Sequence, residues 1–343
     1  MKALALDQYM ELNFREFPKP EIAANEVLVK VKACGICGSD VHGMDGSTGR
    51  RQPPIVMGHE ASGEIVELGA GVKGWQIGDR VTFDSTIYPL DDWYTLQGHY
   101  NLSDNRKVLG VSPAEFKQHG AFAEYVAVPA HILHALPDSV SFEHAAFVEP
   151  VAVAAHAIRI SKIQPGQSAV IVGTGMVGIF VVNLLKIAGV SPIIAIDKDG
   201  KKLEMAAEYG ATHLFHGNEK DLSEKIAELT KNRGTDFGFE VVGITETVNI
   251  CINSLRKGGT AVLVGNLRPE ITMPLQKIVT GELSILGSCA INGEYEMVLD
   301  LMANGKINVD KMISAVAPLS EGADWFKRLY NNEPGLNKVI LQP

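Results

Sequence analysis

Cysteine is scarce in this sequence, and so are excess positive charge and unbroken hydrophobic runs. Four cysteines among 343 residues are too few for a disulfide scaffold, which favours a reducing compartment. Lys and Arg total 31 against 40 Asp and Glu, and the resulting net charge of −9 argues against nucleic acid or an anionic membrane as the main partner. The sequence also contains no internal repeat and no low-complexity segment.

No segment has the pattern of a membrane span or a targeting signal. Three glycines and Asn183 interrupt the uncharged stretch at 168–185, so a strand, a turn and a buried helix explain it better than a span does. At the amino end, Asp7 comes before any apolar core of a signal peptide could form. We therefore expect a cytoplasmic protein that binds neither membranes nor nucleic acid.

Glycine, by contrast, is abundant, and short strands dominate the first part of the chain. The 34 glycines are about 10% of the residues against a usual ~7%, which indicates tight turns and close approach of the backbone to a ligand. Segments such as 27–33 and 122–128 alternate with the period of half-buried strands. Up to about residue 140, the sequence predicts a mainly β domain with a barrel-like form.

A different pattern begins near Phe142. Apolar runs at 169–172 and 193–196 alternate with helical stretches such as 201–209, which is typical of a parallel sheet with helices on both faces. The helical and strand pattern changes again after about residue 288. The predicted organisation is a β catalytic domain made of residues 1–145 and 289–343, with a dinucleotide-binding domain, residues 146–288, inserted between its two parts.

A glycine turn lies at the start of the predicted sheet domain. Gly173, Gly175 and Gly178 follow an apolar strand in the spacing G-x-G-x-x-G. The first glycine permits a tight turn, the second lets a pyrophosphate approach the backbone, and the third lets the helix pack against the strand. Asp197 ends the next strand, where a carboxylate accepts from ribose hydroxyls and repels a 2′-phosphate, so NAD is favoured over NADP although Lys202 lies nearby. A turn that serves packing alone is the alternative.

Three side chains of the β part could hold a metal ion, together with Glu149 at the start of the next domain. Cys37, His59, Glu60 and Glu149 offer a thiolate, an imidazole and carboxylates, a donor set that suits Zn²⁺. Each residue type also has a purely structural interpretation. A cysteine can be a small core residue, a histidine can be buried with its hydrogen bonds made, and a glutamate can be a solvated surface charge. Cys34 and Cys37 also have the spacing of a redox pair, but no thioredoxin-like unit surrounds them.

At these residues the chain resembles a known family. The segments CGICGSDVH, GHEASGEIVELGAGV, GAFAEYV, EPVAVAAHA and VGTGMVG occur in the order of the zinc-dependent medium-chain dehydrogenases, especially the branch of sorbitol and other polyol, galactitol-phosphate and threonine dehydrogenases. The resemblance covers essentially the whole chain. It implies an α/β fold in which a Rossmann doubly wound parallel sheet is inserted into a chaperonin-10-like β-barrel catalytic domain, with the active site in the cleft between them.

The resemblance assigns roles residue by residue. It implies zinc ligation by Cys37, His59 and Glu149, with Glu60 as an alternating ligand or supporting carboxylate. It implies that Asp40 orients His59, and that Ser39 and then His42 pass the substrate proton outward. His42 as a surface histidine at a turn remains the alternative. Motif and resemblance together assign the cofactor to Gly173, Gly175, Met176, Val177, Gly178, Asp197, Lys202, Val242, Val264, Gly265 and Lys338, the last as a basic residue near the pyrophosphate.

The chain departs from many members of this family in one lobe of the β domain. The four cysteine positions of a structural zinc align with Pro89, Asp92, Thr95 and Ser103, none of which supplies a thiolate. We therefore expect a single catalytic zinc and no structural zinc. Packing of aromatic and apolar side chains is predicted to hold the lobe instead, namely Trp93, Tyr94, Leu96 and Tyr100.

The predicted function is that of an NAD-dependent zinc alcohol dehydrogenase, which oxidises a secondary alcohol of polyol type to a ketone by hydride transfer. A threonine- or butanediol-type dehydrogenase and a non-catalytic dinucleotide-binding protein are the alternatives. The Arg-Tyr pair of sorbitol dehydrogenases is missing from residues 287–295, which makes sorbitol itself a weaker candidate, and Asn292 is either a polar substrate contact or a turn residue. The resemblance further implies a homo-oligomer, with a tetramer favoured over a dimer.

Overall fold

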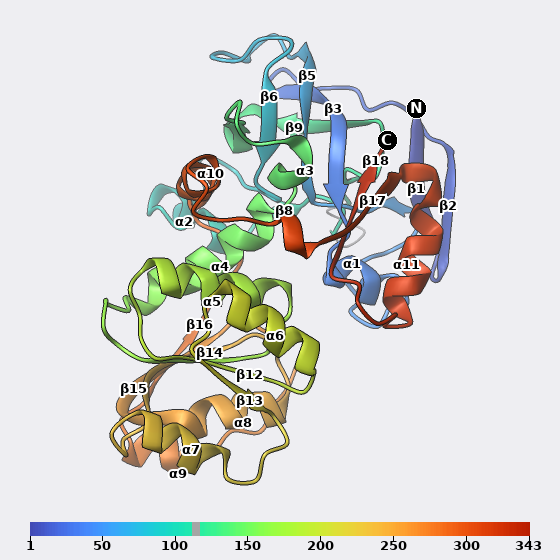
Figure 1. Ribbon diagram of the computed structural model, residues 1–343. Coiled ribbons are helices and arrows are strands. Elements are labelled where there is room, and N and C mark those ends of the chain that lie inside the picture. Colours follow the sequence, from blue (N-terminus) through green and yellow to red (C-terminus); the bar gives the residue numbers. More distant parts are fainter. Residues whose placement is uncertain (112–116) are drawn as a thin grey trace. The chain divides into compact units, whose positions relative to one another are not determined.

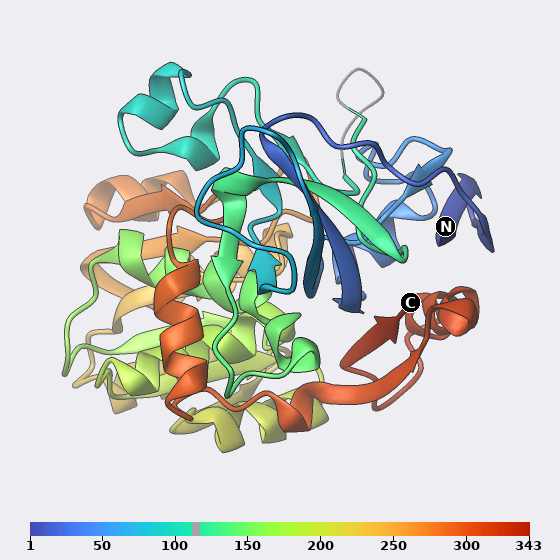
Figure 2. The same ribbon diagram turned by 90° about the horizontal axis from the view of Figure 1, so that it is seen from above.

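The chain folds as two compact units. The computed structural model describes residues 1–111 and 117–343. One unit, the β unit, comprises Met1–Glu149 and Ile291–Pro343, and the other, the sheet unit, comprises Pro150–Ala290. The predicted divisions at 145 and 288 compare with observed ones after Glu149 and Ala290. Both chain termini belong to the β unit (Figures 1 and 2).

Antiparallel strands dominate the β unit. Its larger sheet has the order β10-β6-β5-β3-β18-β17, with β9 paired to β3. These strands are β3 (Glu26–Gly35), β5 (Glu60–Leu68), β6 (Arg80–Phe83), β9 (Tyr125–Pro129), β10 (Leu133–Ala135), β17 (Ile313–Pro318) and β18 (Lys338–Gln342). A second sheet has the order β2-β1-β4, from β1 (Lys2–Gln8), β2 (Glu11–Glu16) and β4 (Ile55–Val56). Strand β18 from the end of the chain pairs with β3 from its beginning, which brings Lys338 to the start of the site described below.

Short helices connect or flank these strands. They are α1 (Gly38–Gly43), α2 (Trp93–Leu96), α3 (Phe142–Ala145), α10 (Tyr295–Ala303) and α11 (Gly322–Tyr330). Helix α2 lies in the lobe between the two strands of a small ribbon, β7 (Thr86–Ile87) and β8 (Lys107–Val108). Helix α4 (Val148–Ser161) begins in the β unit and continues into the sheet unit.

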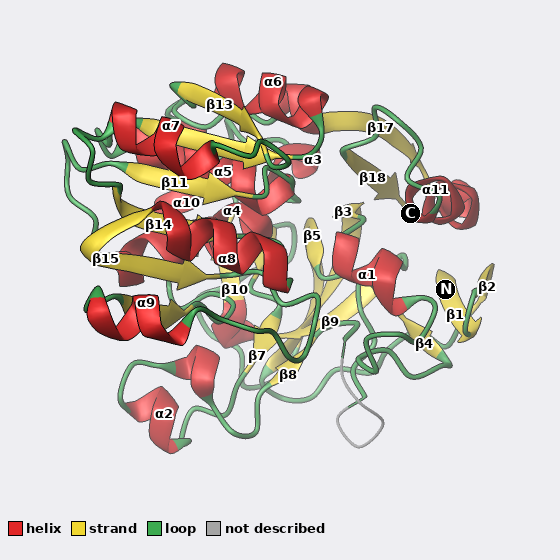
Figure 3. Cartoon of the chain, turned by 90° about the horizontal axis from the view of Figure 1, so that it is seen from below, coloured by secondary structure: helices red, strands yellow, loops and turns green. Residues whose placement is uncertain are grey.

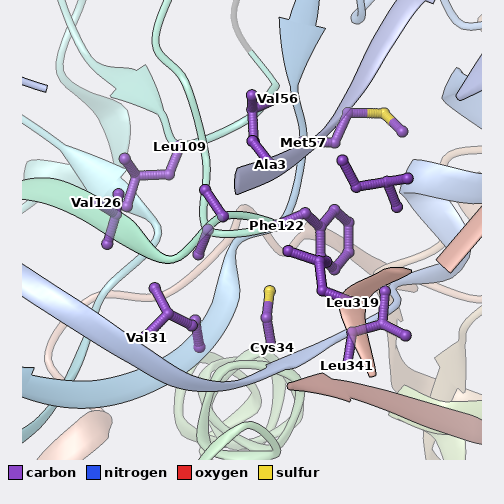
Figure 4. Packing of buried hydrophobic residues seen from close by; sticks show 14 of the residues in the cluster. Ala3, Val31, Cys34, Val56, Met57, Leu109, Phe122, Val126, Leu319 and Leu341 are labelled. Atoms are coloured by element: carbon purple, nitrogen blue, oxygen red, sulfur yellow. The ribbon is translucent and has the colours of Figure 1, made fainter. Parts of the chain in front are cut away.

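The core of the β unit contains one of the two cysteines of the C-x-x-C spacing. Cys34 is fully buried, and Figure 4 shows its sulfur among Val31, Phe122 and Leu341. Burial in these apolar surroundings raises the pKa of the Cys34 thiol well above its usual value. Cys34 therefore behaves as a small core residue, and both cysteines are free thiols rather than a disulfide.

The sheet unit is a six-stranded parallel sheet in the order β13-β12-β11-β14-β15-β16. The strands are β11 (Ala169–Val172), β12 (Ile193–Asp197), β13 (His213–His216), β14 (Thr235–Glu240), β15 (Leu255–Leu263) and β16 (Ser284–Gly287). Helices α5 (Met176–Ile187) and α6 (Gly200–Tyr209) cover one face, and α7 (Leu222–Leu229), α8 (Thr245–Ser254) and α9 (Leu275–Thr280) lie on the other (Figures 1 and 3). The central strand β11 is buried along its whole length because helices cover both faces. The predicted fold class is confirmed.

Among the helices of residues 1–111 and 117–343, none combines the length and the apolar character that crossing a bilayer requires.

Candidate metal centre and dinucleotide site

Three of the four predicted metal ligands lie together in the β unit. The donor atoms of Cys37, His59 and Glu60 are all within 4.8 Å of one another. Cys37 caps the start of α1, where its extended backbone lets Sγ accept from the Ser39 amide at 3.4 Å. His59 follows Gly58, whose φ of +94° turns the chain into β5. The end of β3 pairs with the start of β5, so Gly35 lies opposite Glu60.

A buried ion pair supports the imidazole. Asp40 is fully buried, and its Oδ1 accepts a hydrogen bond from Arg51 Nη2 at 2.7 Å. The same Oδ1 lies 3.5 Å from His59 Nδ1, which is longer than an ordinary hydrogen bond. Burial alone would raise the pKa of Asp40, but His59 and the Arg51 guanidinium outweigh it and lower the pKa. Burial likewise lowers the pKa of His59, but Asp40 and Cys37 outweigh it and raise the pKa well above its usual value. The expected orientation of His59 by Asp40 fits this placement.

A second buried pair holds Glu60. Lys338 Nζ donates to Glu60 Oε2 and to the carbonyl of Ile36, and both charged side chains are almost wholly buried. Burial lowers the pKa of Lys338, but Glu60 and Cys37 outweigh it and raise the pKa. A side chain at Gly35 would place its Cβ 2.6 Å from Glu60 Oε2, so only glycine leaves room for the pair.

The resemblance assigned the Lys338 ammonium to the cofactor pyrophosphate, and this assignment stays a prediction. In the structure the ammonium donates to Glu60 and to the carbonyl of Ile36. The pairing of β18 with β3 carries Lys338 beside the candidate metal ligands.

Glu149 lies near the cluster without belonging to it. It is the first-turn acidic residue of α4, and its Oε1 accepts a hydrogen bond from Ser85 Oγ at 3.1 Å. Burial raises the pKa of Glu149 to about 7, with Glu60 adding to the rise and His59 opposing it. The structure therefore brings three of the four predicted ligands together and places the fourth in their electrostatic field.

The two predicted relay residues lie on the exposed side of α1. Ser39 and His42 are three residues apart on this helix and are both exposed, whereas Asp40 and Val41 between them are buried. Ser39 Oγ lies 3.2 Å from Cys37 Sγ. Ser39 thus lies between the candidate ligand Cys37 and solvent, and His42 is its neighbour one turn along.

The donor set fits zinc. A thiolate, an imidazole and a carboxylate, converging within 4.8 Å, match the ligand types and spacing of a zinc site. Of the two buried carboxylates here, Asp40 pairs with Arg51, and the donor Glu60 pairs with Lys338. Within residues 1–111 and 117–343, this is the one group of three or more such side chains in metal-binding proximity.

In the sheet unit, the three glycines differ in what a side chain would meet. A Cβ at Gly173, where φ is +94°, would overlap Val242, and one at Gly178 would overlap the carbonyl of Gly173. A Cβ at Gly175 would meet nothing within 4 Å. Gly175 also caps the N-terminus of α5, an end that favours anions. The turn therefore leaves open space where a pyrophosphate would approach.

Asp197 is held beside this turn. Its Oδ2 accepts from the Thr174 amide at 2.8 Å and from the Thr174 hydroxyl at 3.2 Å, and Oδ1 accepts from the Asp199 amide. These bonds occupy both lone pairs of Oδ2 and one of Oδ1, so Oδ1 retains a lone pair for a ribose hydroxyl.

The remaining predicted cofactor residues are distributed along the carboxyl edge of the sheet. Met176 and Val177 begin α5, and Val242 lies just beyond β14. Val264 and Gly265 follow β15 and are half-buried. Ligands of open parallel sheets bind at this edge. Lys202 is exposed on α6.

The lobe is held only in part as predicted, because Tyr100 packs but Trp93 and Leu96 are exposed. Trp93 and Leu96 are 66% and 69% exposed, so their packing does not fasten the lobe. Instead the Tyr100 hydroxyl donates to Asp84 Oδ2 at 2.9 Å and accepts from the Gly293 amide at 2.7 Å. The Tyr100 ring also stacks on Tyr88 at 4.2 Å between centroids.

Other lobe positions have structural roles as well. At one of the aligned cysteine positions, Asp92 caps α2 by accepting from the Tyr94 amide at 3.0 Å. Asn292 donates from Nδ2 to the carbonyl of Gly98, 194 positions away in the chain, and its role as a polar substrate contact or a turn residue stays a prediction.

The sequence analysis did not identify Arg51 or Ser85 as parts of the site and its surroundings, and it did not foresee the hydrogen bonds of Tyr100. Arg50 and Arg51 are adjacent in a loop, and one is exposed while the other is 1% exposed. The pattern of the sequence does not distinguish them. The available signal is Gly43, because a Cβ there would overlap the Arg51 side chain.

Comparison with known proteins gives a consistent result. Residues 23–138 match the model of the alcohol dehydrogenase GroES-like domain, and residues 176–304 match that of the zinc-binding dehydrogenases. The chain is 32% identical to sorbitol dehydrogenase of Bacillus subtilis, over 100% of this chain and 97% of that one. It is 32% identical to D-arabitol-phosphate dehydrogenase of Enterococcus avium, over 94% and 91%. It is 34% identical to (R,R)-butanediol dehydrogenase of Bacillus subtilis, over the full length of both.

Solved structures agree with these relatives. A candidate zinc-binding dehydrogenase from Sinorhizobium meliloti, bound to NADP, superposes with a TM-score of 0.90 at 32% identity, covering 100% of this chain and 99% of that one. An alcohol dehydrogenase from Escherichia coli CFT073 in complex with NADH has a TM-score of 0.92 at 28% identity, with the same coverage. The two structures thus hold different nicotinamide cofactors.

Proposed function

The chain belongs to the zinc-dependent medium-chain dehydrogenases, in their polyol dehydrogenase branch, and from this premise we propose that Cys37, His59, Glu60 and Glu149 hold one catalytic zinc at which a secondary alcohol is oxidised with NAD. As a member of this family the protein is an oxidoreductase that acts on CH–OH groups of small-molecule alcohols. The observation that carries the proposal is the convergence of thiol, imidazole and carboxylate donors in the β unit.

The chemistry divides between the bound groups and the chain. When bound, zinc supplies Lewis acidity that lowers the pKa of an alcohol, and NAD supplies the hydride acceptor. Cys37, His59 and Glu60 hold the metal, with Glu149 as the fourth candidate. Ser39 Oγ takes the proton from the substrate hydroxyl while its own proton leaves outward, with His42 as the next acceptor.

A substrate panel tests the activity. We expect NAD reduction with at least one member of a set containing polyols, sugar phosphates, butane-2,3-diol and threonine. A strong zinc chelator should abolish that turnover, and added zinc should restore it. Turnover that survives removal of all zinc would contradict the proposed mechanism.

The choice of NAD rests on Asp197. Its carboxylate lies beside the glycine turn, where it would repel a 2′-phosphate. We expect kcat/KM to be higher with NAD than with NADP, and Asp197→Ala to shift the ratio toward NADP by at least about tenfold, which corresponds to ~1.4 kcal/mol. A wild-type preference for NADP would overturn this assignment.

The zinc content and assembly complete the proposal. We expect one zinc ion per chain by elemental analysis, because Pro89, Asp92, Thr95 and Ser103 occupy the positions of the structural cysteines. Two zinc ions per chain would contradict it. The homo-oligomer, with a tetramer favoured, and the cytoplasmic location are further proposals, and light scattering of the purified protein tests the first.

A further inference from the structure

Arg51 is a buried cation that neither the motifs nor the resemblance assigned. Its side chain is 1% exposed, although it comes from a loop. It occupies the space beside Gly43 in α1, where any Cβ would overlap it. Burying a guanidinium costs several kcal/mol of desolvation unless it is paired and hydrogen-bonded, by the general scale for buried ions. The contacts that stabilise it therefore indicate its role.

One nitrogen of Arg51 makes both of these contacts. Nη2 donates to Asp40 Oδ1 at 2.7 Å and to Ser39 Oγ at 3.1 Å. Asp40 is the carboxylate beside His59, and Ser39 is the hydroxyl beside Cys37. The terminal NH₂ group of Arg51 thus connects Asp40, which lies beside His59, with the hydroxyl of Ser39, which lies beside Cys37.

The hydrogen bond from Arg51 to Ser39 determines how many lone pairs of the Ser39 hydroxyl remain able to accept a proton. A serine hydroxyl has one donor and two acceptor lone pairs. Arg51 occupies one lone pair, and the O–H lies 3.2 Å from Cys37 Sγ as its donor contact. One lone pair is left to accept a proton, on a residue whose side chain is exposed. The positive charge beside Oγ also stabilises the negative charge that develops there as a proton passes.

We propose that Arg51 is a positioning residue of the proton relay, which acts through Ser39. The inference rests on the proposed function. In the oxidation step the substrate O–H bond breaks as its proton joins the remaining lone pair of Ser39 Oγ. The original Ser39 O–H turns from Cys37 Sγ toward solvent, and its bond breaks as that proton passes to His42 or to water. Oγ begins and ends with one proton, and Arg51 keeps all of its own.

A double-mutant cycle tests the route through Ser39. The variants are Arg51→Met, Ser39→Ala and the two combined, with Arg50→Met as the matched control because Arg50 is the adjacent exposed arginine. Using the panel alcohol that the wild type oxidises fastest, we expect Arg51→Met to lower kcat by about 10²-fold with little change in KM, within the usual range for a proton-transfer group. In the Ser39→Ala background the same change should lower kcat by less than about threefold. Additive effects, or a kcat equal to that of Arg50→Met, would overturn the inference.

Zinc content separates this role from a loss of metal. Arg51 also holds Asp40, so we expect Arg51→Met to weaken zinc binding by about tenfold, as removal of a supporting partner does. The kinetic loss should persist at saturating zinc, and the solvent deuterium isotope effect on kcat should increase. Full recovery of kcat on adding zinc would mean that Arg51 acts only through Asp40, and would overturn the relay role. Should Arg51→Met fail to fold, Arg51→Lys keeps a cation but loses the planar fork, and it takes the same tests.

A measurement without substrate keeps the two proposals apart. With Co²⁺ in place of zinc, the thiolate-to-metal absorption band reports on hydrogen bonding to Cys37 Sγ. We expect the band to shift in Arg51→Met, because Ser39 is no longer held in place, and to stay unchanged in Arg50→Met. An unshifted band overturns the positioning role of Arg51. If the wild type oxidised no panel alcohol while Arg51→Met still shifted the band, the proposed substrate class would be overturned and the positioning role would remain supported.

Discussion

The candidate metal centre of the β unit and the glycine turn of the sheet unit are built in different ways. Around Cys37 and His59 the fold buries charged side chains and balances each one, Asp40 with Arg51 and Glu60 with Lys338. The glycine turn has no side chains at its glycine positions, so its backbone is open to a ligand. Substitutions should therefore act through charge and donor chemistry at the first site, and through added volume at the second.

The largest effect expected at the metal centre is that of Cys37→Ala. Loss of the thiolate should reduce zinc binding and turnover by more than about 100-fold, beyond the range seen for supporting partners. Zinc per chain and kcat with the best panel alcohol are the measurements.

Cys34→Ala is the matched control for Cys37→Ala. Cys34 is the other cysteine of the C-x-x-C spacing and is fully buried in the core. Its replacement should keep zinc and turnover while lowering the free energy of unfolding by about 1 kcal/mol, as small losses of core volume do. Equal losses of zinc in both variants would show that the two cysteines act as a pair.

At the glycine turn, one added methyl group should separate folding from binding. Gly175→Ala should change the free energy of unfolding by less than about 0.5 kcal/mol, because its Cβ meets no atom within 4 Å. It should weaken NADH binding by about tenfold or more, equivalent to ~1.4 kcal/mol. Fluorescence titration with NADH and thermal unfolding are the measurements.

Gly178→Ala is the complementary variant, because it should affect the stability of the fold. Its Cβ would overlap the carbonyl of Gly173, so the change should destabilise the fold by about 1–3 kcal/mol, as overpacking does. Unchanged NADH binding in Gly175→Ala would mean that the pyrophosphate does not approach the turn there.

The same contrast explains which parts could be predicted from the sequence. The glycine turn is a local pattern, since strand, glycines and helix are adjacent in the chain, and Gly173 and Gly178 have the tight turn and close packing that the spacing predicts. The strands 169–172 and 193–196 are apolar throughout because both sheet faces are covered. The edge strands β13 and β16 lack such a run and were not predicted.

The metal centre was predicted only in part because its supports are distant in sequence. Cys37, His59 and Glu60 belong to recognisable motifs. The pair of Glu60 with Lys338 joins residues 278 positions apart, and it depends on β18 joining β3. Arg51 differs from Arg50 only in the space that Gly43 leaves for it. Long-range pairing and local volume are properties of the folded chain, so no spacing rule could supply them.

Two buried aspartates of the β unit show how a neighbouring cation changes the pKa of a buried carboxyl group. Arg51 and His59 lower the pKa of Asp40, but Asp84 is bonded to the Thr86 amide and the Tyr100 hydroxyl, and burial raises its pKa to about 6 from 3.8. The folded state therefore binds the Asp84 proton more tightly than the unfolded state does. Stability from this group is present at low pH and is lost as pH rises through about 4 to 6, by about 3 kcal/mol at ~1.36 kcal/mol per pKa unit.

Asp84→Asn tests this sign. Because the amide stays neutral, the free energy of unfolding of the variant minus that of the wild type should increase by about 3 kcal/mol between roughly pH 4 and pH 7.5. Urea unfolding at several pH values measures it. Asp91→Asn, at an exposed position, should show no such trend. A constant difference for Asp84→Asn would mean that Asp84 titrates normally in the folded state.

The smallest effects concern what fastens the lobe. Tyr100→Phe removes a hydroxyl that donates to Asp84 and accepts from the Gly293 amide, so it should lower the free energy of unfolding by about 1–3 kcal/mol while the stacking on Tyr88 remains. Trp93→Ala removes a larger side chain that is 66% exposed, and it should cost less than about 0.5 kcal/mol. Urea unfolding of the two variants compares them directly. A larger decrease in the free energy of unfolding for Trp93→Ala than for Tyr100→Phe would mean that apolar packing, rather than the Tyr100 hydrogen bonds, holds the lobe. An exposed ring can contribute that much only through packing contacts, which the Tyr100 hydroxyl does not provide.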